Sequence, residues 1–142
     1  MNDQLSVIKT DAEWKAELEP LTYHVMREHG TEPPFNNEYN GNKAPGIYFC
    51  RACGAALFSS ETKFESGSGW PSFSAPIAES SVGREKDSRM GMVRVSIFCR
   101  RCGGHIGHVF PDGPRPTRER HCTNSAALKF IAASELQEDG SG

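Results

Sequence analysis

Residues 97–104 read IFCRRCGG and residues 48–55 read YFCRACGA, so the pattern Phe-Cys-x-x-Cys-Gly occurs twice in the chain. A gap of two residues between cysteines lets one tight turn direct both thiolates at a single ion, and the glycine that follows allows a positive φ. Two such turns supply four thiolates, which is the donor set of a closed tetrahedral zinc site, with rubredoxin-like iron as the competitor. The predicted ligands of one structural Zn²⁺ per chain are Cys50, Cys53, Cys99 and Cys102.

Two disulfides, or a redox-active Cys-x-x-Cys pair, are the alternatives to this metal site. The segment MNDQLSVIKT at the start has no basic region followed by an apolar one, so we expect no secretory signal and a cytoplasmic protein. Disulfides disagree with that compartment, and a redox pair does not need a matching second pair. Because a closed four-thiolate site has no open coordination position, we expect the chemistry to lie elsewhere.

The composition is that of one globular domain. The chain has 142 residues, of which 37% are apolar and 24% charged. No stretch approaches the roughly 18 apolar residues of a membrane helix, and a net charge of −2 argues against a nucleic-acid or anionic-membrane binder. We expect a monomer with an N-terminal tail (residues 1–9), one domain (10–133) and a frayed acidic tail (134–142).

The secondary-structure signals change from helix to strand along the chain. A capping box at Thr10 and Glu13 begins a first helix, and a second runs from Pro20 to a stop at Gly30. Strands are predicted over 46–50, 93–99, 109–110, around residue 122 and over 127–132, with a helical turn as the alternative at 126–129. In the second strand, Val93, Val95 and Ile97 share one face. The predicted fold is mainly β (α+β), with short N-terminal helices on an antiparallel core.

The fifth cysteine, Cys122, is a candidate nucleophile. The neighbouring Arg118, Arg120 and His121 supply positive potential, which favours the thiolate. On a strand, Arg120, Cys122 and Asn124 project from one face. The alternative is a buried structural cysteine, which is the commonest fate of an unpaired one.

Two further segments carry candidate site residues. The first contains His105 and His108, and on a strand His108 and Phe110 share one face. These histidines can be catalytic, metal-binding or merely exposed, but four cysteines already complete the metal site. The second is the glycine-rich loop before Trp70, where the indole is a candidate pocket wall, whereas Phe73 is expected in the core.

Together these residues resemble the B-type methionine sulfoxide reductases, which act on the R epimer. The resemblance runs from about Trp14 to Ala133 and rests on both cysteine pairs and on four motifs. The motifs are GTEPPF (residues 30–35), SGSGWPSF (66–73), GHIGHVFPDGP (104–114) and RHCTNS (120–125). The fold implied is two small antiparallel sheets that form an open barrel or tent, with zinc at the edge away from the active site.

The resemblance also implies roles for the candidate residues. Cys122 attacks the sulfoxide sulfur, His105 and His108 act as general acid and positioning groups, and Asn124 orients oxygen or water. Trp70 and Phe110, with Arg120 beside them, bind the substrate. Cys122 is left as a sulfenic acid. The expected partners are oxidised proteins and peptides that contain methionine-R-sulfoxide, and the expected role is repair under oxidative stress.

The chain departs from many family members at the residue that resolves this sulfenic acid. Ser68 stands where they carry a resolving cysteine, and Glu65 occupies a second known location for it. We therefore expect an external thiol, either thioredoxin or a small thiol such as glutathione. Two rival hypotheses are a non-catalytic zinc-knuckle interaction module, which leaves Cys122 and Asn124 unexplained, and Cys–His hydrolysis, which needs no reductant.

Overall fold

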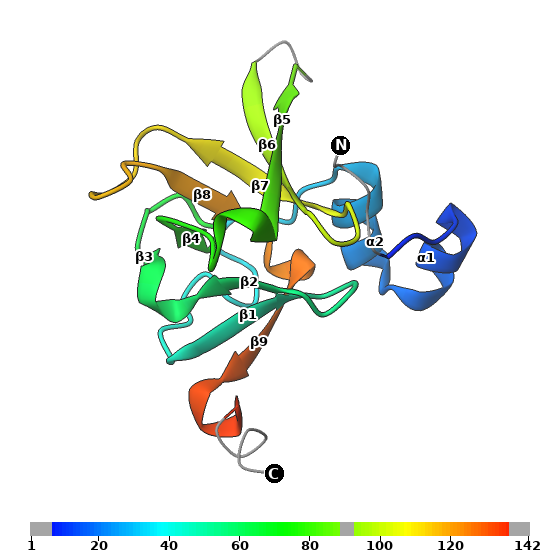
Figure 1. The fold of residues 1–142 in the computed structure, drawn as a ribbon, viewed down its shortest axis with the longest axis horizontal. Helices are drawn as coiled ribbons and strands as arrows, with labels where there is room; N and C mark the ends of the chain where they lie inside the picture. Colours follow the sequence, from blue (N-terminus) through cyan, green and yellow to red (C-terminus); the bar gives the residue numbers. More distant parts are fainter. Residues whose placement is uncertain (1–6, 89–92, 137–142) are drawn as a thin grey trace.

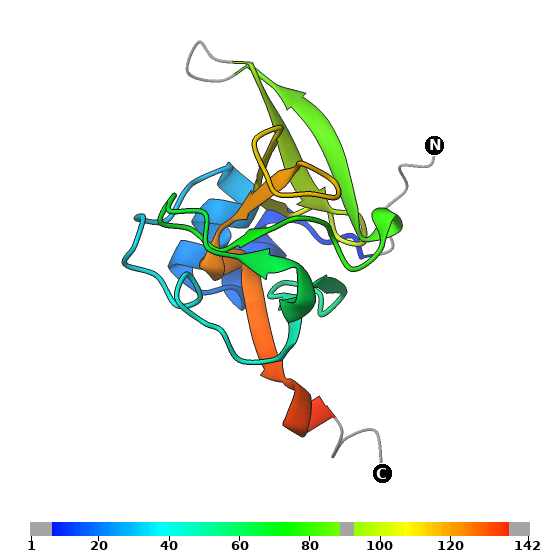
Figure 2. The same cartoon turned by 90° about the vertical axis from the view of Figure 1, so that its left-hand side faces the viewer.

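The computed structural model describes residues 7–88 and 93–136. A six-stranded and a three-stranded antiparallel sheet face each other across the core, and two helices pack against one side (Figures 1 and 2). The helices are α1 (Asp11–Glu17) and α2 (Pro20–Glu28). The smaller sheet has the order β2 (Ala56–Ser59), β1 (Gly46–Cys50), β9 (Leu128–Ala132). The larger has the order β3 (Lys63–Phe64), β4 (Ser72–Phe73), β8 (Arg120–Thr123), β7 (His105–Phe110), β6 (Arg94–Cys99), β5 (Val82–Asp87). The predicted fold class is confirmed.

Both helices begin as the sequence predicts. The Thr10 side chain accepts from the Glu13 backbone N–H, and the Glu13 carboxylate accepts from the Thr10 N–H, which completes the capping box. The second helix ends one residue earlier than expected, because His29 takes the left-handed conformation with φ 58°. A Cβ at Gly30 would lie 2.1 Å from the exposed His24 ring, which would have to shift to admit it.

Aromatic side chains join the two sheets. Phe58 of β2 stacks on Phe73 of β4 with ring centroids 4.4 Å apart, and Tyr48 of β1 meets Phe73 edge-on at 5.1 Å. Phe73 is therefore a core residue, as predicted. The helices cover the end of this core with Trp14, Val25 and Met26, all of them buried.

Burial does not follow the alternation along residues 93–99. Val95 and Ile97 lie two residues apart in regular register, so they share a face as predicted. Val93 and Val95 are nevertheless 69% and 37% exposed, whereas both Ile97 and Ser96 are buried. The β5–β6 hairpin extends away from the smaller sheet (Figure 1), and the pairing of β6 with β7 shifts register between Ile97 and Phe98. Farther along the chain, the two alternatives for residues 126–129 are both partly right: a 3₁₀ turn spans Ser125–Ala127 and β9 follows.

The predicted tails lie mostly outside the described residues. Residues 133–136 form a short helical turn, and 137–142 are not described. At the other end, the Val7 N–H donates to the Arg101 carbonyl, which holds residue 7 against the second cysteine turn. Within 7–88 and 93–136, no helix is long and apolar enough to cross a membrane.

Candidate active site and metal centre

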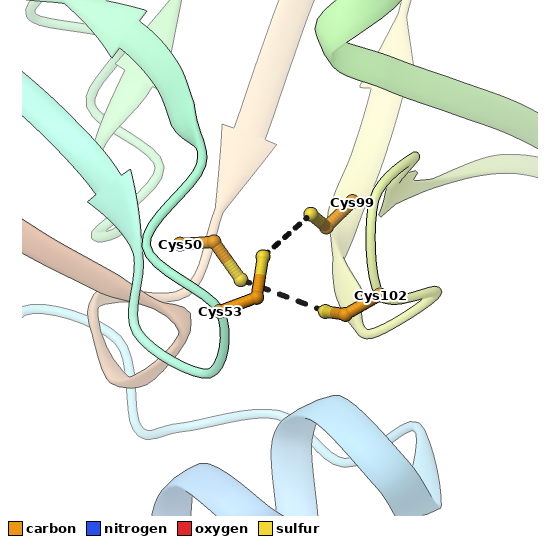
Figure 3. A group of neighbouring side chains, drawn as sticks. All are labelled: Cys50, Cys53, Cys99 and Cys102. Atoms are coloured by element: carbon orange, nitrogen blue, oxygen red, sulfur yellow. Dashed lines mark hydrogen bonds between the residues drawn. The ribbon is translucent and has the colours of Figure 1, made fainter. Parts of the chain in front are cut away.

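The four paired cysteines converge from the two sheets (Figure 3). Cys50 ends β1 and Cys99 ends β6, and each is followed by a turn that brings its partner back toward the other pair. All four sulfur atoms lie within 4.8 Å of one another, with Cys50 and Cys102 3.7 Å apart and Cys53 and Cys99 3.6 Å apart. A tetrahedral ion with bonds of about 2.3 Å to sulfur requires separations of about 3.8 Å. The cluster therefore has the size of a four-thiolate metal site.

The same distances exclude disulfides, which require about 2.05 Å between sulfurs, and all five cysteines are free. Gly54 and Gly103 have φ of 85° and 79°, as their place after each pair predicts. Their N–H groups donate to the carbonyls of Cys50 and Cys99 rather than to sulfur.

A separate cavity of about 270 Å³ lies beside Cys122. It brings together six of the residues predicted from the sequence: Trp70, His108, Phe110, Arg120, Cys122 and Asn124. Thr31, Ser68 and Arg94 also line it. None of the four clustered cysteines reaches this cavity, so the metal centre and the cavity are distinct sites.

Strand pairing places Cys122 between two polar side chains of the flanking strands. Ser72 of β4 and His108 of β7 lie directly opposite it on the flanking strands. Directly opposed residues of antiparallel strands share a face, so the imidazole and the thiol project to the same side. The Ser68 hydroxyl reaches Cys122 from the glycine-rich loop, with 3.9 Å between oxygen and sulfur.

The expected lowering of the Cys122 pKa is wrong. Burial raises the pKa of this thiol, although hydrogen bonds from Ser68 and the charge of Arg120 act in the opposite direction. Two of the three basic neighbours do not face the sulfur: Arg118 is exposed, and His121 lies buried on the other face of β8 against Phe58. Burial also lowers the pKa of His121, which disfavours the charged form of its ring.

Arg120 is held in place by an aspartate and an aromatic ring. Its Nε and Nη2 atoms donate to the two carboxylate oxygens of Asp112 at 2.9 and 3.2 Å. Its guanidinium lies over the Phe110 ring, 4.4 Å from the centroid. These contacts hold the Arg120 guanidinium beside Cys122, while Asp112 offsets part of its charge.

His108 has a partner that the sequence did not reveal. Its Nε2 lies 2.9 Å from the carboxylate of Asp87, which is 3% exposed and belongs to β5. An imidazole N–H donates to this carboxylate, and this contact fixes the tautomer of His108. The sequence carried no signal for this contact, because no strand was predicted over the residues that form β5.

His105 does not line the cavity. Its side chain is 3% exposed, and its ring lies between those of His108 and His29, with centroid distances of 5.3 and 4.8 Å. The structure therefore places His105 behind His108, where it can orient that ring.

Asn124 is fixed by main-chain groups on both sides. Its Oδ1 accepts from the Glu32 N–H at 3.1 Å, and its Nδ2 donates to the Ile106 carbonyl at 3.0 Å. An amide NH₂ has two hydrogens, so one N–H of Asn124 is left for a group in the cavity.

Glu32 is a second residue whose role the sequence did not reveal, although it stands in the GTEPPF motif. Its carbonyl accepts from the Trp70 indole N–H at 2.9 Å, and its N–H holds Asn124. Its buried carboxylate accepts from the N–H groups of Ser125 and Ala126, and burial raises its pKa. Glu32 therefore connects the Trp70 indole, the side-chain amide of Asn124 and the turn that follows β8.

Comparisons with known proteins agree with this geometry. A family model described as "SelR domain" matches residues 18–132. The chain is 56% identical to "Peptide methionine sulfoxide reductase MsrB" of Leptospira interrogans over 87% of its own length and 95% of that protein. It is 53% identical to the protein of the same name from Bradyrhizobium diazoefficiens, over 87% of this chain and 89% of that one. Identity to the mouse "Methionine-R-sulfoxide reductase B3, mitochondrial" is 49%, over 96% of this chain and 54% of that one.

Proposed function

The chain belongs to the SelR family of B-type peptide methionine sulfoxide reductases, and on this basis we propose a role for each residue of the site. The enzyme is an oxidoreductase that reduces methionine-R-sulfoxide in proteins at the expense of a thiol. The proposal assigns Cys122 as nucleophile, His108 as general acid with His105 behind it, and Asn124 as a hydrogen-bond donor to the sulfoxide oxygen. Trp70, Phe110 and Arg120 form the binding wall.

In the first step the sulfur of Cys122 attacks the sulfoxide sulfur and forms a transient sulfur–sulfur bond. The oxygen then passes from the substrate sulfur to the sulfur of Cys122, as the substrate's sulfur–oxygen bond and the sulfur–sulfur bond both break. Methionine leaves, and Cys122 retains the oxygen as a sulfenic acid. One proton must reach the oxygen, and the raised pKa of Cys122 means that the resting thiol carries it into the site. His108, opposite Cys122 and bonded to Asp87, is placed to transfer this proton.

Epimer choice is assigned to the walls of the cavity. The sulfoxide sulfur carries a methyl group, an oxygen and the methionine side chain, so three separate contacts distinguish R from S. We assign the methyl group to Trp70 and Phe110 and the oxygen to the remaining N–H of Asn124. The S epimer would exchange the oxygen and the methyl group between these two environments.

The second half of the cycle needs a thiol from outside the chain. An incoming thiol attacks the sulfenic sulfur, releases water and forms a mixed disulfide, and a second thiol then frees Cys122. The other four cysteines lie in the metal cluster. We propose thioredoxin or a small thiol such as glutathione as the donor.

We assign Zn²⁺, one ion per chain, to Cys50, Cys53, Cys99 and Cys102, whose sulfur separations suit its bond length. Such an ion would supply ligation energy that joins β1 of one sheet to β6 of the other. We further propose a cytoplasmic monomer whose domain spans residues 10–133, on composition alone.

The observation that carries this proposal is one cavity that holds Cys122, His108 and Asn124 together. The test is a reduction assay on the separate R and S epimers, with thioredoxin or glutathione as donor. We expect the R epimer alone to react, and Cys122→Ser to be inactive with unchanged fold and metal content. An active Cys122→Ser variant would overturn the assignment, and turnover without reductant would favour hydrolysis.

A further inference from the structure

An exposed apolar strip adjoins the wall of the substrate cavity. It consists of Pro33, Pro34 and Phe35, all exposed, and the Phe35 side chain is 67% exposed. The strip follows Thr31, which lines the cavity, and Glu32, whose carbonyl holds the Trp70 indole. A single exposed apolar residue is ordinary on a protein surface, but three in a row beside the apolar wall of a binding cavity form a candidate interaction surface.

The backbone at Phe35 is held in a conformation that its side chain disfavours. Phe35 has φ 63°, in the left-handed region, where a bulky residue is an outlier. Its N–H donates to the Gly69 carbonyl at 2.7 Å, and this bond fixes it to the loop that carries Trp70. Strained residues persist where the surrounding structure holds them, and they cluster at binding sites.

The Trp70 loop is shaped to receive this strip. Gly69 has φ 95°, and a Cβ at that position would lie 2.6 Å from Pro34 and 2.9 Å from the Phe35 ring. The Asn37 side chain donates to the carbonyls of both Gly69 and Pro33, at 2.9 and 3.0 Å. The strip is therefore tied to the cavity wall by several bonds and is ordered before a substrate arrives.

We infer that Pro33, Pro34 and Phe35 form a docking surface for the polypeptide that carries the methionine sulfoxide, and that they favour an apolar side chain two or three residues away from it. The inference rests on the proposed function of the cavity. The Phe35 N–H bonds to the carbonyl of Gly69, the residue before Trp70. Because an extended peptide advances about 3.3 Å per residue, we expect a side chain two or three residues from the methionine sulfoxide to reach Phe35. The occupant is the substrate chain itself because the surface is continuous with the cavity that takes its oxidised side chain.

The test compares peptides with a minimal substrate. Each peptide contains one methionine-R-sulfoxide in a sequence of Gly and Ser, with either Leu or Ser placed at one position up to three residues away. The minimal substrate is N-acetyl-methionine-R-sulfoxide methylamide. Both kinds of substrate are assayed with dithiothreitol as reductant. The variants are Phe35→Asn, which tolerates the left-handed conformation, and Phe35→Tyr, which keeps the ring. Ile8→Asn is the matched control, since Ile8 is 79% exposed on the N-terminal segment.

We expect the wild-type KM to be about five- to tenfold lower for Leu than for Ser at the second or third position from the methionine sulfoxide, as for partial burial of an apolar side chain. Phe35→Asn should abolish that preference with kcat unchanged and with normal activity on the minimal substrate, whereas Phe35→Tyr and Ile8→Asn should retain it. An active wild type without the preference would overturn the docking surface alone. Loss of activity on the minimal substrate in Phe35→Asn would show a structural role instead. A wild type inactive on every R-sulfoxide would overturn the reaction and the surface with it.

Discussion

The hydroxyl oxygen of Ser68 lies 3.9 Å from the sulfur of Cys122, so a cysteine at this position would bring a second thiol beside the first. The hydroxyl of Ser66 bonds to both Ser68 and Ser72, at 2.8 and 2.9 Å, so the oxygen atoms of three serines surround this side of the nucleophile. A hydroxyl can donate a hydrogen bond to a sulfenate, but it cannot form a disulfide with it.

The first prediction is that the Cys122 sulfenic acid accumulates when reductant is withheld. The reduced enzyme is treated with one equivalent of R-sulfoxide, trapped with a sulfenic-acid-specific dione and weighed as an intact protein. One adduct per chain is expected on Cys122, with zinc retained. A disulfide accompanied by loss of zinc would instead identify one of the clustered cysteines as the resolving thiol.

Ser68→Cys provides the matched control for this experiment. Because Ser68 already contacts Cys122, the introduced thiol should convert the sulfenic acid to an internal disulfide and abolish the adduct. Ser66→Cys, one hydroxyl farther from the sulfur, should do so more slowly.

The second prediction concerns the metal. Cys99→Ser should lower the melting temperature strongly or prevent folding, because the ligation energy of a four-thiolate site, on the order of 10 kcal/mol, is also folding energy. Far-UV circular dichroism and thermal melting measure the effect. A melting curve equal to that of the wild type would contradict the structural role of the cluster, and Cys122→Ser, outside the cluster, is the control.

The third prediction tests the His108–Asp87 pair. His108→Ala should lower the single-turnover rate by about 10²–10⁴-fold, the usual contribution of a general acid. Asp87→Asn should lower it less, since the ring loses its charged partner but keeps its place opposite Cys122. His105→Ala should also slow the reaction through the orientation of His108. If zinc content falls while the remaining loaded enzyme reacts normally, the histidines belong to the metal site.

The fourth prediction follows from the raised pKa of Cys122. The rate of alkylation by iodoacetamide should rise with pH to a midpoint above the ordinary thiol value of 9.0, because burial disfavours the thiolate. Arg120→Gln removes a nearby positive charge and should move the midpoint higher, and Ser68→Ala should do the same. Asp112→Asn leaves the charge of Arg120 unopposed and should move it lower. A wild-type midpoint below 9.0 would contradict this assignment.

The fifth prediction concerns Glu32. In Glu32→Gln, an amide replaces the carboxylate that accepts from two backbone N–H groups, so one of them loses its acceptor. The free energy of unfolding should fall by about 1–3 kcal/mol in urea titrations. The rate on R-sulfoxide should fall less than the stability, because the contacts to Asn124 and Trp70 come from the main chain of residue 32 and remain in the variant. Glu38→Gln, at an exposed carboxylate paired with Arg51, should change neither quantity appreciably.

Features that depend on local chemistry were readable in the sequence. The spacing of the two cysteine pairs predicts a cluster of four sulfurs because a two-residue turn can point its thiols in one direction. The capping box at Thr10 and Glu13 fixes the start of α1 through contacts three residues apart. Alternation along a strand likewise places Arg120 and Cys122 on one face, and both line the cavity.

Tertiary structure decided the properties that depend on burial and on partners far away in the chain. Asp87 reaches His108 across β6, and Glu32 reaches Asn124 and Ser125, pairings that no local pattern encodes. The pKa of Cys122 could not be inferred from its basic neighbours, because β8 turns His121 to the opposite face and packing removes water from the sulfur. Sequence sets which groups are present, whereas desolvation and the distance between charges, which fix their reactivity, exist only after the sheets have packed.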